Sequence, residues 1–159
     1  MLDDAGSAPR VSYLVKWVER GLRVRLDAAL ATQGVSTQEY TALSVLSRRD
    51  GLSSAQLARR TLVTAQAMNQ LVIAMERRGL IVRKADPDHN KIQRASLTPA
   101  GRKVVAACDR ATAPVEALLL SGLSAPEVSQ LRRVLSTCVE ALQPDFDTRK
   151  RETPAASAD

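Results

Sequence analysis

The chain has 159 residues, 23 of them Lys or Arg against 17 acidic residues, which gives a formal net charge of +6. Hydrophobic residues make up 45% of the chain but aromatic residues only 3%, so a core must be built mainly from Leu, Val and Ala, which favour helices. No stretch of the sequence is as long and apolar as a membrane span, which needs about 18 apolar residues. The first residues do not resemble a secretory signal, and the two cysteines do not indicate a disulfide framework. We therefore expect a cytoplasmic protein.

Two helices are predicted in the first third of the chain. Residues 1–9 are small and polar, and we expect them to form a disordered arm. From residue 10 to residue 34, apolar residues recur every three or four positions, which predicts a long amphipathic helix. Ser36 is followed three positions later by Glu39, the pattern of a capping box that opens a second helix.

The next segment has the spacing of a helix-turn-helix motif. Ser53 and Gln56 form a second capping-box pattern, and Thr64 is a favourable N-cap for a longer helix that ends before Gly79. Residues 61–63 form the short connection between these two helices, as in a helix-turn-helix. The second helix is expected to bury a stripe of apolar side chains, namely Met68, Leu71, Val72 and Met75.

A β-hairpin and two further helices are predicted after this motif. Residues 80–82 and 92–97 are typical of strands, and residues 86–90 between them are rich in turn formers. Thr98 and Pro99 predict the start of a helix that Pro114 should kink, and Ser124 is expected to cap the last helix. The expected inward side of that last helix consists of Val128, Leu131, Leu135, Cys138 and Leu142.

These elements predict a mostly α-helical protein with a winged helix-turn-helix lobe at residues 36–99. The helix at residues 10–34 and the helices at residues 98–143 carry more apolar surface than one small lobe can bury, so we assign them to a homodimer interface. Residues 144–159 are polar and are expected to form a disordered tail.

The second helix of the motif is the expected reader of DNA, because such a helix presents its N-terminal half to base edges in the major groove. Gln66, Asn69 and Gln70 fall opposite the apolar stripe, and amide side chains can make paired hydrogen bonds to adenine. Arg77 is the expected phosphate contact. The alternative is that these polar residues only face solvent and contact no DNA. Helix-capping residues at the two helix starts also favour phosphate binding, namely Ser53, Ser54 and Thr64.

Basic charge supports this interpretation, because it is concentrated in the same part of the chain. Between Ser53 and Lys103 there are ten Lys or Arg residues and only three acidic residues. A local excess of this kind is typical of nucleic-acid binders, although many basic proteins bind no nucleic acid.

Five short motifs, in their order and spacing, resemble the MarR family of bacterial regulators; they lie at residues 57–60, 64–71, 76–80, 86–87 and 97–101. The resemblance extends over about residues 10–143. It implies a winged helix-turn-helix in each subunit and dimerisation through the first and last helices. It also implies repression of nearby genes, often relieved by a small aromatic or anionic ligand.

The sequence departs from that family in the loop of the hairpin. His89 and Asn90 stand where the family commonly has an aspartate and a basic or polar residue. Lys91 stands at the position of an arginine that enters the minor groove, and lysine lacks the planar fork of arginine. We therefore expect Asn90 and Lys91 to contact DNA through phosphates more than through bases.

Other residues give weaker hypotheses. Tyr13, Trp17 and Tyr40 are expected near the effector cavity that the resemblance implies, with ordinary core packing as the alternative. Cys108 and Cys138 fall on apolar helix faces, so small buried side chains are expected, with redox sensing as the alternative. The single His89 beside two aspartates is better explained by a turn than by a metal, so no metal, cofactor or catalytic residue is expected.

Together these observations predict a homodimer that binds a pseudo-palindromic operator in double-stranded DNA and represses transcription until a small molecule releases it. Two alternatives remain open at this point. One is an architectural DNA-binding protein without an effector, and the other is a winged-helix module that binds proteins.

Overall fold

The computed structural model describes residues 8–87, 89 and 91–142. The expected tail, most of the expected arm, and Asn90 lie outside the described residues. The elements are, in chain order, α1 (Val11–Ala31), α2 (Thr37–Arg48), β1 (Leu52–Ser53), α3 (Ser54–Thr61), α4 (Ala65–Arg77), β2 (Ile81–Ala85), β3 (Gln93–Leu97), α5 (Pro99–Leu120) and α6 (Ala125–Leu142).

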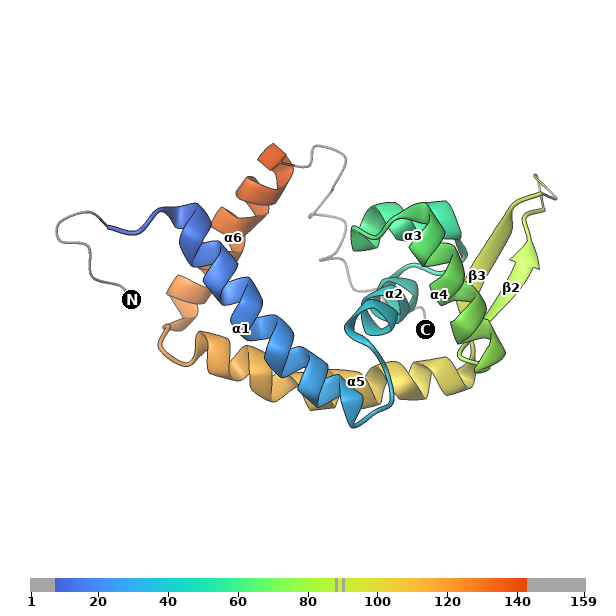
Figure 1. Ribbon diagram of the computed structural model, residues 1–159, viewed down its shortest axis with the longest axis horizontal. Coiled ribbons are helices and arrows are strands. Elements are labelled where there is room, and N and C mark those ends of the chain that lie inside the picture. The colour runs from blue at the N-terminus through green and yellow to red at the C-terminus, as the bar shows by residue number, and fades with distance from the viewer. Residues whose placement is uncertain (1–7, 88, 90, 143–159) are drawn as a thin grey trace, which may run out of the picture.

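The long helix α5 connects two parts of the molecule (Figure 1). Helices α2, α3 and α4 and the β2–β3 hairpin gather around its N-terminal end, whereas α6 and the N-terminal half of α1 lie toward its other end. Helix α1 packs across α5, and α2 contacts both of them. This arrangement is the mostly helical winged helix-turn-helix with flanking helices that the sequence predicts.

The sheet is small and antiparallel, with the strand order β1-β3-β2. Ile81 pairs with Leu97 and Ala85 with Gln93, which confirms the predicted hairpin. Strand β1, where Leu52 pairs with Ala95, was not predicted. A strand of two residues is too short to show the alternation of apolar and polar residues that identifies strands.

The core of the lobe is formed where α2, α3, α4, the sheet and the start of α5 meet. Met68, Val72 and Met75 are fully buried there, whereas Leu71 packs against the core only in part, so the predicted stripe of α4 is confirmed. A second, smaller cluster joins α1, the α1–α2 turn and α5 through Leu30, Val35 and Cys108.

The predicted helix caps form as local hydrogen bonds. Each capping hydroxyl accepts a hydrogen bond from the backbone N–H three residues later, at Ser36, Ser53, Thr64 and Thr98. At the start of α5 the helix approaches strand β2 so closely that a Cβ atom on Gly101 would lie 2.0 Å from the carbonyl oxygen of Leu80. Only glycine fits at this position, and its close approach fixes α5 against the lobe.

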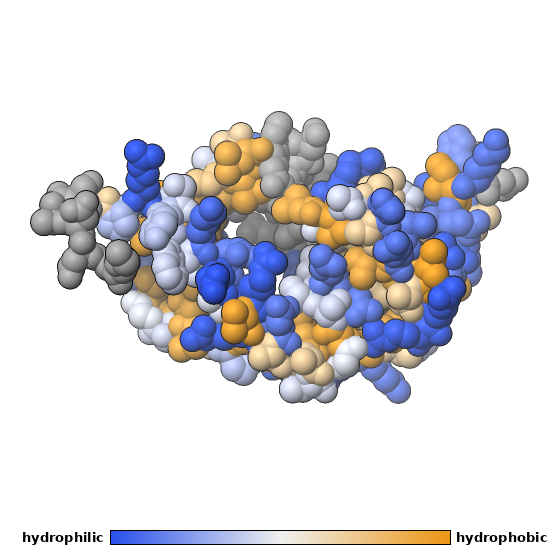
Figure 2. All heavy atoms as spheres, in the orientation of Figure 1, coloured by the Kyte–Doolittle hydropathy of each residue, from blue (hydrophilic) through white to orange (hydrophobic). Residues whose placement is uncertain are grey.

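Helix α5 continues through Pro114 as one helix of 22 residues. Helix α6 begins where Ser124 donates its N–H to the Glu127 carboxylate at 2.7 Å, as expected for a cap. The expectation that α6 points its apolar residues inward is wrong for the single chain, because no residue of α6 is buried. Leu135 and Leu142 are 45% and 82% exposed, and Figure 2 shows apolar surface open to solvent on this part of the molecule.

None of the helices within the described residues combines the length and the apolar character that crossing a membrane requires.

Candidate nucleic-acid interface

Helix α4 is held by its buried side and presents a polar side to solvent. Gln66, Asn69 and Gln70 are exposed on the side away from Met68 and Val72, and Arg77 continues this surface at the end of the helix. Because α-helical residues three and four positions apart lie on one face, the three amides form a contiguous surface. That surface has the donors and acceptors needed to read adenine edges in a major groove.

The predicted phosphate contacts at the helix starts are already used as caps. The Ser53 hydroxyl accepts a hydrogen bond from the Gln56 N–H at 3.2 Å, while the Gln56 side chain accepts one from the Ser53 N–H at 2.9 Å. The Thr64 hydroxyl accepts from the Ala67 N–H at 3.2 Å. Ser54, half-buried, is the first residue of α3. These bonds orient the two helix N-termini, whose free N–H groups favour anions.

The turn between α3 and α4 contains a conformation that the sequence did not indicate. Leu62 has a φ of +58°, in the left-handed region that a branched side chain seldom adopts. Its side chain is 65% exposed rather than buried. The turn therefore holds an apolar side chain open to solvent two residues before the N-cap of α4.

The hairpin loop is braced by a buried carboxylate. Asp86 is only 1% exposed, forms an ion pair with Arg94 of β3, and accepts a hydrogen bond from the His89 N–H at 3.2 Å. Arg94 also donates to the Gly51 carbonyl oxygen at 3.0 Å, just before β1. The sequence indicated a turn role for Asp86 but not this strut, which joins the wing to the entrance of the helix-turn-helix.

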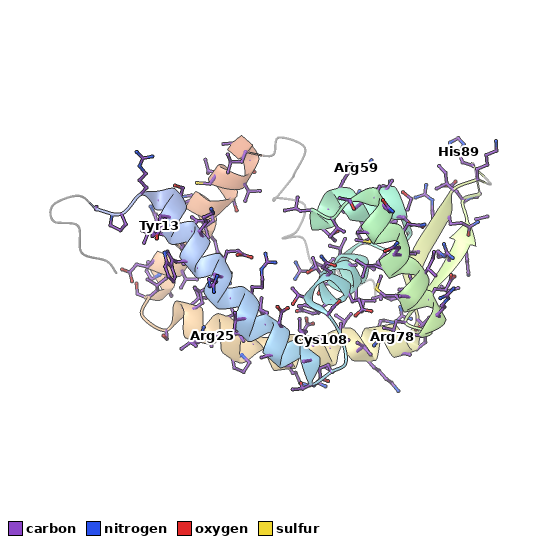
Figure 3. The ribbon with its side chains drawn as sticks, in the orientation of Figure 1. Tyr13, Arg25, Arg59, Arg78, His89 and Cys108 are labelled. Carbon is purple, nitrogen blue, oxygen red and sulfur yellow. The ribbon has the colours of Figure 1, made fainter. Side chains whose placement is uncertain are left out.

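The predicted wing contact Lys91 is exposed in the turn before β3. His89 is also exposed and lies at the tip of the wing (Figure 3). No cluster of three metal-ligating side chains occurs in the described part of the chain. Lys91 therefore has the position of a surface contact for phosphates, while Asn90 falls outside the described residues.

Arginines outside the predicted set add positive charge to the first helix of the motif, α3. Arg59 is exposed at the end of the lobe that also carries the wing tip (Figure 3). The pKa of Arg60 is lowered by burial and by the nearby positive charges of Arg49 and Arg59. Mutual repulsion of this kind shows a concentration of positive charge, to which a phosphate backbone is complementary. The signal in the sequence is the pair of adjacent arginines at the end of a short helix.

Other basic residues in this region are paired with carboxylates. Arg83 of β2 donates to Glu76 of α4 from Nε at 2.8 Å, and this hydrogen bond is the main reason why the pKa of Glu76 is lowered. Arg78 turns away from the polar side of α4 and binds Glu39 of α2 at 2.8 Å. Only part of the positive charge counted in the sequence is therefore free for a nucleic acid.

The three aromatic residues predicted for an effector cavity do not come together. Tyr13 and Trp17 contact each other edge to face, with ring centroids 6.1 Å apart, and are 51% and 57% exposed. Tyr40 lies in the α1–α2–α5 junction, where its hydroxyl donates to Asp109 at 2.6 Å. Burial, and secondarily this bond, raise the pKa of Tyr40. The prediction of one pocket lined by all three is wrong, because Tyr13 and Trp17 are on the exposed part of α1.

A cleft of about 630 Å³ is instead found between α1 and the helix-turn-helix. One wall comes from α1, and the other comes from the start of α2 and the turn before α4. Its lining residues are Glu19, Leu22, Arg23, Leu26, Asp27, Ser36, Thr37, Gln38, Thr41, Thr61, Leu62 and Val63. Leucine side chains give it an apolar interior, and the sequence pattern alone did not reveal it because its walls are distant along the chain.

The two cysteines differ in environment. Cys108 is buried in the α1–α5 cluster, and burial raises the pKa of its thiol, with a smaller contribution from Asp109. A raised pKa disfavours the reactive thiolate. Cys138 is exposed on α6. Cys108 therefore acts as a small apolar side chain at the junction.

Comparison with known proteins agrees with this geometry. A family model described as "MarR family" matches residues 33–92. The HTH-type transcriptional repressor Rv2887 of Mycobacterium tuberculosis is 35% identical over 131 residues, which cover 82% of this chain and 94% of the repressor. The chain belongs to the MarR family.

Solved structures of bacterial transcriptional regulators have the same fold. Rv2887 in complex with DNA superimposes with a TM-score of 0.68 and 33% identity, covering 83% of this chain and 98% of that one. Its complex with p-aminosalicylic acid gives a TM-score of 0.68 and 33% identity, covering 82% of this chain and 98% of that one. A probable transcriptional regulator from Pseudomonas aeruginosa gives 0.68 at 28% identity, covering 81% and 96%.

Proposed function

We propose that this MarR-family protein is a sequence-specific DNA-binding repressor, in which α4 reads the operator and the wing and arginines hold the phosphate backbone. The observation that carries this proposal is the exposed amide surface of α4, formed by Gln66, Asn69 and Gln70 and bordered by arginines. The structure of the relative Rv2887 with DNA supports the same role. Such a regulator acts in the cytoplasm, on the chromosome.

The active form we propose is a homodimer built on α1, the end of α5, and α6. These helices expose large apolar side chains that a single chain leaves in water, including Val11, Leu14, Val18, Leu118, Leu119, Val134, Leu135 and Leu142. Covering apolar surface of this extent stabilises an interface. A two-fold dimer places two recognition helices about 34–36 Å apart, which matches successive major grooves, so its operator is a pseudo-palindrome.

The effector site we propose is the cleft between α1 and the helix-turn-helix. Its apolar interior suits a small aromatic ring, and Arg23 at the wall can pair with an anionic group after leaving Glu19. The relative's complexes with salicylic acid and p-aminosalicylic acid support a ligand of this class. A ligand in this cleft selects dimers whose α4 helices no longer match the operator spacing, and repression is released.

The decisive experiment measures binding to the DNA that flanks the protein's own gene, against a shuffled duplex, by fluorescence anisotropy over a salt series. We expect a preference of about 10³-fold or more for one flanking site and an affinity that falls steeply with salt. Addition of salicylate should weaken operator binding in the same assay, whereas benzyl alcohol, which lacks the carboxylate, should have less effect.

The other outcomes identify the alternatives. Equal and salt-sensitive binding to both duplexes would contradict the proposal in favour of an architectural DNA-binding protein. Absence of binding to either duplex at low salt would favour a winged-helix module that binds proteins.

A further inference from the structure

The C-terminal end of α4 is attached to the turn between α1 and α2 by a single forked side chain. Arg78, the residue that follows α4, donates from Nη1 to the Glu39 carboxylate at 2.8 Å and from Nη2 to the Gly34 carbonyl oxygen at 2.9 Å. The two acceptors lie 39 and 44 residues away along the chain. Because the guanidinium is planar and binds both acceptors at once, it fixes direction as well as distance.

Glu39 is itself held in place by the cap of α2. Its second carboxylate oxygen accepts hydrogen bonds from the Ser36 N–H at 2.9 Å and from the Ser36 hydroxyl at 3.0 Å. The side chain of Glu39 is only 12% exposed, against 41% for Arg78. The Arg78 contact is therefore made to a rigid, partly buried group rather than to a mobile surface carboxylate, which gives it more weight than an ordinary surface ion pair.

The same network reaches the cleft. Ser36 lines the cleft wall, and the turn of residues 61–63, which precedes the N-cap of α4, lines it too. Helix α4 thus follows directly on the cleft residues 61–63 at its N-terminal end. Its other end reaches the cleft indirectly, because Arg78 binds Glu39 and Glu39 in turn binds the lining residue Ser36.

We infer that Arg78 and Glu39 are positioning residues, which set the angle of α4 relative to α1 and so the operator spacing that the dimer accepts. This inference rests on the proposed function, because it concerns how the dimer selects DNA. Arg78 touches no base in this role. It acts by restricting the orientation of the amide surface that does.

Arg77 is a matched control next to it in the chain. It has the same side chain, is exposed on the polar side of α4, and is the expected phosphate contact. Loss of a phosphate contact weakens binding to all sequences and reduces the salt slope by about one. Loss of a positioning contact should leave the salt slope unchanged. Arg78 does not contact a phosphate in this role, so it releases no counterion when the protein binds DNA.

The test compares Arg78→Gln, Glu39→Gln and Arg77→Gln on the operator and on duplexes with one base pair added or removed between the half-sites. We expect Arg78→Gln and Glu39→Gln to keep the wild-type salt slope but to reduce the preference for the natural spacing by about fivefold or more, the lower end of typical coupling between sites. Arg77→Gln should lower affinity at every spacing alike and lower the salt slope.

Two further measurements separate positioning from stability. The double variant should show little more loss of spacing preference than Arg78→Gln alone, because Arg78→Gln already removes the contact with Glu39. Arg78→Lys keeps the charge but not the fork, so it should keep the salt slope and lose spacing preference at an unchanged melting temperature. A reduced salt slope in Arg78→Gln, an unchanged spacing preference, or additive losses in the double variant would overturn the inference.

Failure of the proposed function gives a different result, because the wild type itself would then show no operator preference. In that case hydrogen exchange of the free protein tests the contact. Amides in the last turn of α4 should exchange faster in Arg78→Gln than in Arg77→Gln, and equal exchange would overturn the inference.

Discussion

Asn69 lies in the middle of the exposed amide surface of α4, one turn after the N-cap Thr64. Replacement by Ala removes two hydrogen-bonding groups without touching the core. We expect Asn69→Ala to weaken operator binding by about 1–3 kcal/mol and to relax the preference for one base pair. Anisotropy titrations against operators substituted at each position measure both effects. An unchanged affinity would show that the recognition surface is elsewhere on α4.

Lys91 in the wing provides the contrasting control for that experiment. If it contacts phosphate, Lys91→Ala weakens binding to operator and random duplex alike and reduces the salt slope by about one. A selective loss on the operator would instead indicate that the wing reads base edges in the minor groove.

The roles of single residues could be predicted where they depend on neighbours in the chain. The capping hydroxyls of Ser36, Ser53 and Thr64 bind groups three residues away, and the sequence shows both partners. The contacts of Arg78 and Arg94 could not be predicted, because their partners Gly34 and Gly51 are 44 and 43 residues away. For the same reason, only a contribution to the positive charge could be assigned to these arginines from the sequence.

At the scale of elements, the wing depends on the strut between Arg94 and Asp86. Arg94→Ala leaves a carboxylate that is 1% exposed without its cation. Because Arg94 itself is 42% exposed, we expect the free energy of unfolding to fall by about 2–3 kcal/mol, less than for a fully buried pair. Arg83→Ala is the matched control, because its partner Glu76 is 34% exposed, and it should cost less than about 1 kcal/mol. Urea unfolding measures both. Equal costs would show that burial of Asp86 does not decide the stability of the wing.

The junction of α2 with α5 should be sensitive to alkaline pH. The folded protein raises the pKa of Tyr40 above its ordinary value of 10.0, so the folded state holds this proton more tightly than the unfolded state. The stabilisation is complete below about pH 10 and is lost as pH rises through the folded-state pKa. Melting temperatures of wild type and Tyr40→Phe between pH 8 and 11 should converge at the alkaline end. A constant difference would contradict this assignment.

The helices and strands were predicted more completely than the clefts and pockets that form between them. Apolar periodicity and caps identified each helix of the lobe, because both are local properties of the chain. The cleft was missed and the aromatic pocket was wrong, because both depend on how α1 crosses α5. Tyr13 and Tyr40 lie on the first two helices as expected, yet one is exposed and the other is bonded to Asp109.

At the scale of the whole molecule, we predict that a charged substitution on the apolar face of α6 abolishes dimerisation and DNA binding together. Leu135 is 45% exposed in the single chain, and Leu135→Asp places a charge in the proposed interface. We expect sedimentation velocity to detect monomers and operator affinity to fall by at least tenfold, since a monomer binds one half-site. Ser129→Asp, an exposed position that is not three or four residues from Val134, Leu135 or Leu142, is the control and should remain dimeric. A dimeric Leu135→Asp would place the interface elsewhere.

The attachment of α4 has a consequence for how such a protein changes its target. Its buried side chains and both of its end contacts are separate from the amides of Gln66, Asn69 and Gln70. Substitutions at these three positions can therefore change the DNA sequence that the protein recognises without disturbing its folding. After gene duplication, two copies can diverge to control different promoters by a few surface changes, and a library randomised at these positions is a practical route to repressors of chosen specificity.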